Sequence, residues 1–309
     1  MKLSFDNRVA IVTGAGQGLG RSHALALAKK GARVMVNDLG QGGEPSSASL
    51  ETVELIRQSG GEAFANGADV ANYGQVEVMV AETLRRWGQL DIVVNNAGIL
   101  RDRSFVKMTA EDFSSVVDIH LKGSFNVSHA AWASMREQKY GRIVMTTSSS
   151  GLFGNFGQAN YSAAKMGLVG LMNTLAIEGE NYGIRVNCIL PIAKTIMTEG
   201  LMDEQVLDLF NPSDVSVGVL ALCADEAPNR LILSAGAGCY SASLTHQTRS
   251  IFIPSAERTP EIVLASMSEL ASTEGMEPLT SSPEHTLRFA REAALAKGMD
   301  MSDIRWGKG

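Results

Sequence analysis

The chain has 309 residues, of which 45% are apolar and 19% charged, and its formal net charge is −6. These values are ordinary for a globular protein with a buried core, and they argue against broad binding to nucleic acids or anionic membranes. The three cysteines, Cys188, Cys223 and Cys239, match no metal-ligand spacing. We therefore expect buried thiols in a reducing compartment and no metal site.

Targeting signals are the next feature that the sequence can exclude. Residues 1–6 have no apolar signal region, no apolar run is long enough to span a bilayer, and residues 305–309 are not a peroxisomal address. We therefore expect a cytoplasmic protein with no membrane partner and no nucleic-acid partner.

Short apolar runs alternate with longer helical patterns through most of the chain. Strands are expected at 8–13, 33–38, 62–65, 92–95, 141–147 and 185–190. Helices are expected at 19–30, 72–87, about 110–137 and 158–180, and residues 41–49 form a predicted loop. This order is typical of a Rossmann-type α/β fold, a doubly wound parallel sheet that binds its ligand beyond the carboxyl ends of the strands.

The last part of the chain, residues 240–309, has a different pattern. Thr259-Pro260-Glu261 and Ser282-Pro283-Glu284 each place a hydroxyl before a proline and an acid, which is typical of a helix start. Gly275 and Gly298 are natural helix stops. We expect a main domain at 1–239 and a C-terminal helical extension at 240–309.

A glycine-rich segment joins the first predicted strand to the first helix. Glycines at this place let the backbone turn tightly and approach a pyrophosphate, although a purely structural turn is the alternative. Asp38 ends the second strand, where a carboxylate can accept hydrogen bonds from an adenosine ribose and repel a 2′-phosphate. Neither Ala15 nor Leu39 is basic, so NAD is favoured over NADP. The residues expected to bind the cofactor here are Gly14, Gly16, Gln17, Gly18, Leu19, Gly20 and Asp38.

Tyr161 and Lys165 are spaced to lie on one face of a helix. A tyrosine with a pKa of about 10 is a poor base at neutral pH, and a nearby ammonium and a cationic nicotinamide would favour its phenolate. Ser148 follows the strand at 141–147, and Asn95-Asn96-Ala97-Gly98 closes the strand at 92–95. A tyrosine–lysine pair is common by chance, but here all four motifs occur in order.

With these four motifs, residues 6–236 resemble the short-chain dehydrogenase/reductase family. Segments 36–40, 95–105 and 154–161 are similar to the dehydrogenase units of peroxisomal multifunctional enzymes of type 2. That resemblance implies NAD-dependent oxidation of (3R)-hydroxyacyl-CoA esters in lipid or steroid side-chain degradation, with some 17β-hydroxysteroids also accepted. The fused hydratase and sterol-carrier parts are absent, which implies a stand-alone bacterial relative.

The resemblance also implies roles for individual residues. Tyr161 would exchange the proton with the substrate oxygen, Lys165 would hold the nicotinamide ribose and lower the tyrosine pKa, and Ser148 would orient the substrate oxygen. Further contacts to the cofactor are implied for Asp69, Val70, Asn95, Ala97, Gly98, Pro191 and Thr195.

Two positions depart from the family pattern. His120 stands where most members have an asparagine that supports a proton relay, so it is either a relay residue or a buried, hydrogen-bonded histidine. Ile192 follows Pro191 where many relatives have glycine, which predicts an altered substrate lid next to Thr195.

Three functions remain open from the sequence: oxidation of a 3-hydroxyacyl-CoA, oxidation of a free 17β-hydroxysteroid, and non-catalytic sensing of a dinucleotide. Arg101, Arg103 and Lys194 are the cations that could meet CoA phosphates. An apolar cleft is expected from Leu152, Phe153, Phe156, Ile192, Ile196, Met197, Leu201 and Met202. Small residues in one helix predict a homodimer or homotetramer, although they could instead pack against the chain's own sheet: Ala163, Ala164, Gly167 and Gly170.

Overall fold

A computed structural model of the chain describes residues 3–193, 208–279 and 281–299. The chain divides into two compact units, Met1–Ser243 and Leu244–Gly309. The sequence predicts a boundary after residue 239 instead, because it gives no signal for the strand Cys239–Ser243, which belongs to the first unit.

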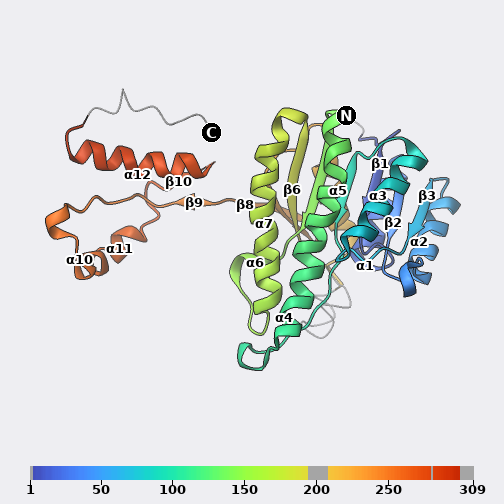
Figure 1. The fold of residues 1–309 in the computed structure, drawn as a ribbon, viewed down its shortest axis with the longest axis horizontal. Helices are drawn as coiled ribbons and strands as arrows, with labels where there is room; N and C mark the ends of the chain where they lie inside the picture. The colour runs from blue at the N-terminus through green and yellow to red at the C-terminus, as the bar shows by residue number, and fades with distance from the viewer. Residues whose placement is uncertain (1–2, 194–207, 280, 300–309) are drawn as a thin grey trace. The chain divides into compact units, whose positions relative to one another are not determined.

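The first unit is built on an eight-stranded sheet (Figure 1). Its order is β3-β2-β1-β4-β5-β6-β7-β8, with the first seven strands parallel and β8 antiparallel to β7. The chain runs outward from β1 to β3 and then returns to the other side of β1, so the crossover changes direction between β1 and β4. The strands are β1 Val9–Val12, β2 Arg33–Asn37, β3 Ala63–Asn66, β4 Ile92–Asn95, β5 Gly141–Thr146, β6 Ile184–Pro191, β7 Ile232–Gly236 and β8 Cys239–Ser243.

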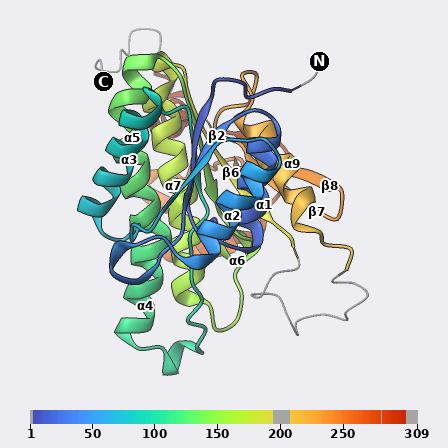
Figure 2. The same cartoon turned by 90° about the vertical axis from the view of Figure 1, so that its right-hand side faces the viewer.

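Helices cover both faces of this sheet (Figure 2). One face carries α1 Gly18–Lys29, α2 Ser47–Gln58 and α9 Pro212–Cys223; the other carries α3 Tyr73–Trp87, α5 Gly123–Gln138 and α7 Ala159–Gly179. Successive strand residues alternate between the two cores, so Val12 packs with α1 and α9 while Ile11 packs with α3 and α5. The expected Rossmann-type fold is confirmed.

Two predicted segments are organised differently in the structure. The predicted loop at 41–49 contains the short turn η1 Gln41–Gly43, but α2 begins inside it at Ser47 because the Ser46 side chain caps the helix. The predicted helix at 110–137 is interrupted: α4 Ala110–Val117 passes through a π-helical turn, η3 Asp118–Lys122, into α5. Shorter elements of this unit are η2 Phe105–Lys107, α6 Ser149–Phe153 and η4 Glu180–Tyr182.

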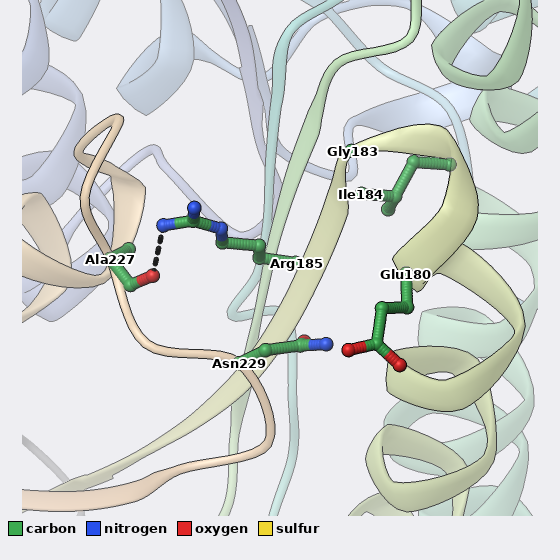
Figure 3. Close-up of a pocket in the computed structure, with 6 residues that line it drawn as sticks. All are labelled: Glu180, Gly183, Ile184, Arg185, Ala227 and Asn229. Carbon is green, nitrogen blue, oxygen red and sulfur yellow. Dashed lines mark hydrogen bonds between the residues drawn. The ribbon is translucent and has the colours of Figure 1, made fainter.

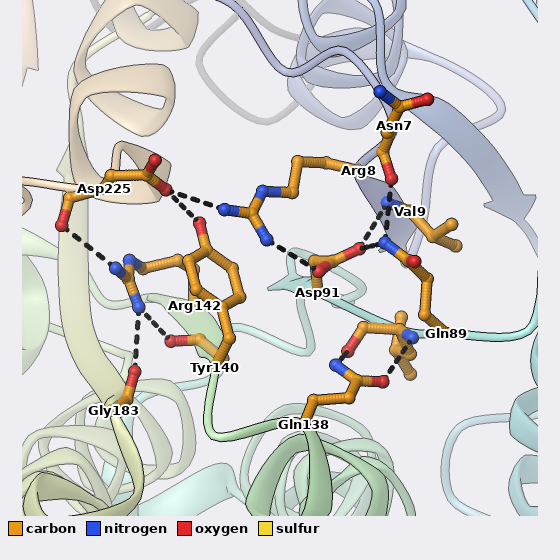
Figure 4. A network of polar contacts seen from close by, with 12 residues as sticks. Asn7, Arg8, Val9, Gln89, Asp91, Gln138, Tyr140, Arg142, Gly183 and Asp225 are labelled. Carbon is orange, nitrogen blue, oxygen red and sulfur yellow. Dashed lines mark hydrogen bonds and ion pairs between the residues drawn. The ribbon is translucent and has the colours of Figure 1, made fainter.

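A polar network ties together the amino-terminal ends of the strands (Figure 4). Asp91 accepts hydrogen bonds from Arg8 Nη1 (3.1 Å) and from the Val9 amide (2.8 Å), and Arg8 also reaches Asp225 (3.0 Å). The Tyr140 ring lies between two guanidinium groups, 3.6 Å from that of Arg8 and 4.2 Å from that of Arg142. Burial raises the pKa of Tyr140, so this tyrosine stays protonated. The network therefore stabilises the sheet at the amino-terminal ends of its strands, opposite the carboxyl ends.

The second unit is a helical extension in which two short antiparallel strands pair across the helices between them. Its elements are β9 His246–Gln247, η5 Ser255–Glu257, α10 Pro260–Ala265, α11 Met267–Leu270, β10 Glu277–Pro278 and α12 Ser282–Ala296. Thr259 caps α10 as predicted, whereas Ser281 rather than Ser282 caps α12. Gly298 follows α12 in a left-handed conformation, and Gly275 lies in a turn after α11.

The structure also bears on the cysteines and on membrane-spanning helices. Cys188 and Cys223 are buried as expected, but Cys239 is exposed because it lies in β8 at the edge of the sheet. No helix in the described part of the chain combines the length and apolarity needed to cross a bilayer.

Candidate active site

Because the strands are parallel, the residues that follow their carboxyl ends share one edge of the sheet. Thr13 follows β1, Asp38 follows β2, and Ser148 lies just beyond β5, while Asn95 ends β4. Three of the four motifs found in the sequence, together with Asp38, therefore meet at the edge where a doubly wound sheet binds its ligand.

The glycine-rich turn is tightly packed at Gly16 and Gly20 and open at Gly18. A side chain at Gly16 would come within 2.3 Å of Asp38 Oδ2, and one at Gly20 within 2.1 Å of the Gly14 carbonyl oxygen. Gly18 instead has a positive φ of 55° at the start of α1, and no described atom lies within 4 Å of the position its Cβ would take. The first turn of α1 therefore presents its backbone to open space, with Gln17 at the helix cap and Leu19 packed against the core.

Two residues that the sequence did not single out for the site hold this turn. The Asn96 side chain donates to the carbonyl oxygens of Thr13 (3.0 Å) and Gly14 (3.2 Å). In return Thr13 Oγ1 accepts from the amides of Asn96 and Ala97, both at 3.0 Å. The turn after β1 and the turn after β4 are thus one hydrogen-bonded unit, and the Asn-Asn-Ala-Gly motif is the signal that could have shown it.

The adenosine end of the expected site also comes together. Asp38 accepts a 2.6 Å hydrogen bond from Ser46 Oγ, a partner that the sequence did not predict. Asp69 and Val70 follow β3; the Asp69 amide bonds to Gln75 (2.8 Å), and the Val70 carbonyl accepts from Asn126 (2.8 Å). In a dinucleotide, the open backbone at Gly18 fits the pyrophosphate, the Asp38 carboxylate fits the ribose, and the apolar Val70 fits the adenine.

The expected catalytic group is assembled from β5, α6 and α7. Lys165 lies one turn after Tyr161 on α7, is buried, and donates from Nζ to the Thr146 carbonyl at 2.5 Å. Its ammonium lies 5.4 Å from the centre of the Tyr161 ring. Ser148 caps α6 and hydrogen-bonds Tyr161. The structure therefore brings Ser148, Tyr161 and Lys165 together.

On balance, the protein's own groups raise the pKa of Tyr161 above its usual value. Burial is the largest effect and raises this pKa, the hydrogen bond with Ser148 lowers it, and the charge of Asp102 raises it. Burial also lowers the pKa of Lys165 to about 7, so its charge is partly lost near neutral pH. The sequence leads us to expect that the lysine and a cationic nicotinamide together favour the phenolate. In the protein alone the pKa of Tyr161 is raised.

His120 lies in the π-helical turn and is almost completely buried. Its Nε2 lies 2.8 Å from the Ile99 carbonyl oxygen and 3.0 Å from the Ile99 amide, so either neutral tautomer can bond Ile99. Burial, together with the charge of Lys165, lowers the pKa of His120 to about 3. Nδ1 is buried without a hydrogen-bond partner among the described residues. Because its pKa is this low, His120 is neutral near pH 7.

Two buried asparagines hold elements near this edge of the sheet, and one of them positions the loops around the tyrosine. Asn160 donates to the carbonyl oxygens of Arg101 (3.0 Å) and Asp112 (2.9 Å) and accepts from the Tyr161 amide (2.8 Å). The sequence did not predict this role. Asn95 is buried too, and its side chain donates to Ser128 Oγ (3.0 Å) of α5, so it points inward from the edge of the sheet.

Part of the expected site lies outside the described residues. This applies to Thr195 and Lys194 and to four residues expected in the apolar cleft: Ile196, Met197, Leu201 and Met202. Pro191 ends β6 beside Ala235, at the same edge as Ser148. Phe153 and Phe156, by contrast, are described and strongly exposed, at 77% and 89%.

A hollow of about 400 Å³ lies at the other edge of the sheet, where β6 begins (Figure 3). Two of its polar side chains have partners within the chain: Arg185 bonds the Ala227 carbonyl, and Asn229 bonds the Ala176 carbonyl and the Val186 amide. This hollow is separate from the catalytic group, because parallel strands place it at the opposite end of the sheet.

Comparison with known proteins extends the pattern over most of the first unit. The model of the short-chain dehydrogenase family matches residues 8–205. Peroxisomal multifunctional enzyme type 2 of Mus musculus is 50% identical over 244 residues, which is 76% of this chain and 32% of the mouse protein. This chain thus spans about a third of that relative's length.

Solved structures agree with this match. The full-length peroxisomal multifunctional enzyme type 2 of Drosophila melanogaster superposes with a TM-score of 0.80 at 36% identity, covering 96% of this chain and 51% of that one. A 7α-hydroxysteroid dehydrogenase in complex with NADH and 7-oxo glycochenodeoxycholic acid superposes with a TM-score of 0.70 at 27% identity, covering 76% of this chain and 95% of that one. The chain belongs to the short-chain dehydrogenase/reductase family, as an oxidoreductase related to the dehydrogenase unit of peroxisomal multifunctional enzyme type 2.

Proposed function

We propose that the protein oxidises the 3-hydroxyl of a 3-hydroxyacyl-CoA to a ketone, with NAD as the oxidant. The observation that carries the proposal is the grouping of Tyr161, Ser148 and Lys165 at the carboxyl edge of the sheet, beside a turn that fits a dinucleotide. The 50% identity to a multifunctional enzyme supports the acyl-CoA substrate class.

The protein residues divide the chemistry among them. When bound, NAD would supply the hydride acceptor for the carbinol carbon. Tyr161 takes the hydroxyl proton as the general base, and Ser148 donates a hydrogen bond to the same substrate oxygen. Lys165 passes the proton onward and holds the nicotinamide ribose, and His120 fixes the Ile99 backbone beside the tyrosine.

The choice of NAD rests on the charges near the adenosine ribose. Asp38 offers a carboxylate, Ala15 is buried, and Leu39 is exposed but uncharged. Arg21 on α1 is a nearby cation, but it is paired with Glu51 at 2.9 Å and with the Gly16 carbonyl at 2.8 Å. A 2′-phosphate would therefore meet a negative charge and no unpaired cation among these residues.

Support for an acyl-CoA comes from the loop after β4. Arg101 and Arg103 are exposed and lie close enough to Asp112 to lower the pKa of its carboxyl, after the larger effect of the Thr109 hydrogen bonds. They can meet CoA phosphates, and the exposed Phe153 and Phe156 offer apolar surface for the acyl part. A free 17β-hydroxysteroid is the main alternative, favoured by the similarity to a hydroxysteroid dehydrogenase. A non-catalytic dinucleotide sensor would have no need of the assembled tyrosine and lysine.

We also propose that the protein is a homo-oligomer. On α7, Ala163 and Gly170 are exposed, and no described atom lies within 4 Å of the place where a Gly170 Cβ would sit. Ala164 and Gly167 are different: Ala164 is buried, and a side chain at Gly167 would meet Leu121, so these two pack within their own chain. The cytoplasmic location stays a prediction, since the mouse relative is named as a peroxisomal enzyme.

The direct test is turnover with a (3R)-hydroxyacyl-CoA and either NAD or NADP, followed by the absorbance of the reduced cofactor. We expect turnover with a higher kcat/KM for NAD, and a smaller preference in Asp38→Ala. A higher kcat/KM for NADP in the wild type contradicts the proposed cofactor, and no turnover of any secondary alcohol contradicts the proposed enzyme.

A further inference from the structure

Asp38 does not stand alone at the end of β2. Its Oδ2 atom packs on the glycine-rich turn, so closely that a Cβ at Gly16 would lie 2.3 Å away. The same oxygen accepts the 2.6 Å hydrogen bond from Ser46 Oγ. Among the described residues, no hydrogen bond reaches the other oxygen, Oδ1. One oxygen of the carboxylate is thus held by the protein, and the other is available to a ligand.

Ser46 is itself held in place by α2. Its Oγ accepts from the Ser49 amide at 3.0 Å, and its carbonyl oxygen accepts from Ser49 Oγ at 2.8 Å. Because this hydroxyl accepts from the helix, its single proton points away, toward Asp38. A chain of polarised hydrogen bonds therefore runs from the positive N-terminal end of α2 through Ser46 to the carboxylate.

The loop that carries Ser46 has little freedom. A bridge pairs Leu39 with Pro45. The Glu44 carbonyl oxygen lies in a space that a Cβ at either Gly40 or Gly67 would fill, at 2.0 Å in both cases. The loop is therefore packed between the turn after β2 and the segment after β3, and it delivers Ser46 to Asp38 in one position.

We propose that Ser46 is the residue that orients Asp38 for selection of NAD, a role that rests on the proposed use of NAD. With Oδ2 bonded to Ser46, the carboxylate turns Oδ1 toward the adenosine ribose and stays where it would oppose a 2′-phosphate. The N-terminus of α2 would otherwise attract a phosphate. Ser46 bonds both the N-terminus of α2 and Asp38. It thereby holds a negative charge next to this positive helix end, so that the site favours NAD over NADP.

The test measures cofactor binding directly, through the fluorescence of NADH and NADPH titrated with the full-length protein. In Ser46→Ala we expect the Kd for NADH to rise about tenfold, the effect of one lost hydrogen bond to a charged group. We expect the Kd for NADPH to stay constant or fall, because the freed carboxylate can turn away. Ser46→Thr keeps the hydroxyl and should bind both cofactors within about twofold of the wild type.

A matched control separates this role from helix capping. Thr109 also caps its helix, α4, by accepting from the amide three residues on, that of Asp112, at 3.0 Å. Thr109→Ala removes a cap that makes no hydrogen bond to Asp38 in the described part of the chain. We expect it to lower the unfolding midpoint about as much as Ser46→Ala while leaving both Kd values within about twofold of the wild type.

Several outcomes overturn the inference while leaving the proposed function intact. These are a Ser46→Ala variant that binds both cofactors as the wild type does, an equal weakening in Thr109→Ala, or a failure of Ser46→Thr to restore binding. A wild-type protein that binds NADPH more tightly than NADH has a different meaning, because it contradicts the proposed cofactor itself.

Discussion

The imidazole of His120 stands edge-on to the ring of Tyr161, with ring centroids 5.2 Å apart and an angle of 88° between the planes. The same imidazole occupies the space beside Gly98, where a Cβ would lie 2.1 Å from its Cε1. His120 therefore connects the tyrosine to the loop after β4. A neutral histidine in this place positions its neighbours and carries no charge of its own.

This contact predicts that the effects of substitutions at Gly98 and His120 depend on each other. Gly98→Ala should reduce the free energy of unfolding by about 1–3 kcal/mol, because the added methyl overlaps a buried ring. In the His120→Ala background the same change should cost at least about 1 kcal/mol less, since the ring is gone. Urea unfolding of the four proteins measures this difference. Additive effects, within about 0.5 kcal/mol, would show that the ring does not impose the glycine.

The second prediction concerns the general base. Tyr161→Phe removes only the hydroxyl that Ser148 bonds, so we expect kcat to fall at least about a hundredfold. NADH binding and the unfolding midpoint should stay close to those of the wild type. Turnover within a few-fold of normal would refute the assignment.

The third prediction is a loss of stability in mild acid. His23 and His120 are both buried, and burial lowers each pKa from 6.5 to about 3. Between these two values the unfolded chain binds more protons than the folded one, so the free energy of unfolding decreases as the pH falls from about 6.5 toward 3. At pH 5 each histidine should account for a loss of about 2 kcal/mol relative to pH 7.

Urea unfolding at pH 7 and pH 5 measures this loss. His23 is on α1, and its Nδ1 lies 2.8 Å from Ser216 Oγ of α9. His23→Gln therefore removes one of the two titrating groups at a place outside the catalytic group. The variant should lose about 2 kcal/mol less than the wild type over this interval. An equal loss in both proteins would mean that His23 does not titrate as its burial requires.

The fourth prediction is association through α7. Its exposed face carries Ala163, Met166, Gly170 and Ile177. We expect light scattering at micromolar concentration to report at least a dimer of the 32.9 kDa chain. Gly170→Leu should dissociate it without unfolding, because the space beside Gly170 is open within the chain. A wild-type particle of 33 kDa would exclude association. An unchanged oligomer in the variant would place the contact elsewhere than Gly170.

The parts of the fold that the sequence predicts are those with local signals. The strands Ile92–Asn95 and Arg33–Asn37 are apolar runs with clear ends, and the Tyr161–Lys165 pair is a spacing along one helix. The rest depends on contacts between distant segments. Ser46 and Asp38 meet only because a packed loop brings them together, and the π-helical turn at His120 has no local sequence signature.

The buried asparagines illustrate the same limit. Asn160 precedes Tyr161 in the chain, yet its function depends on carbonyl groups of residues 101 and 112. A sequence shows that an amide is present but not which distant carbonyls it will reach, because hydrogen-bond partners are set by packing. The sequence analysis does not predict α2 for a similar reason, because this helix starts at the Ser46 cap inside a segment of turn-forming residues.

The measurement that tests the proposed substrate most directly compares kcat/KM for a (3R)-hydroxyacyl-CoA with that for 17β-estradiol, both with NAD and with Tyr161→Phe as the control. We predict that the thioester is the better substrate and that the variant loses activity toward it. Turnover of the steroid without turnover of the thioester would contradict the acyl-CoA function and support a hydroxysteroid dehydrogenase.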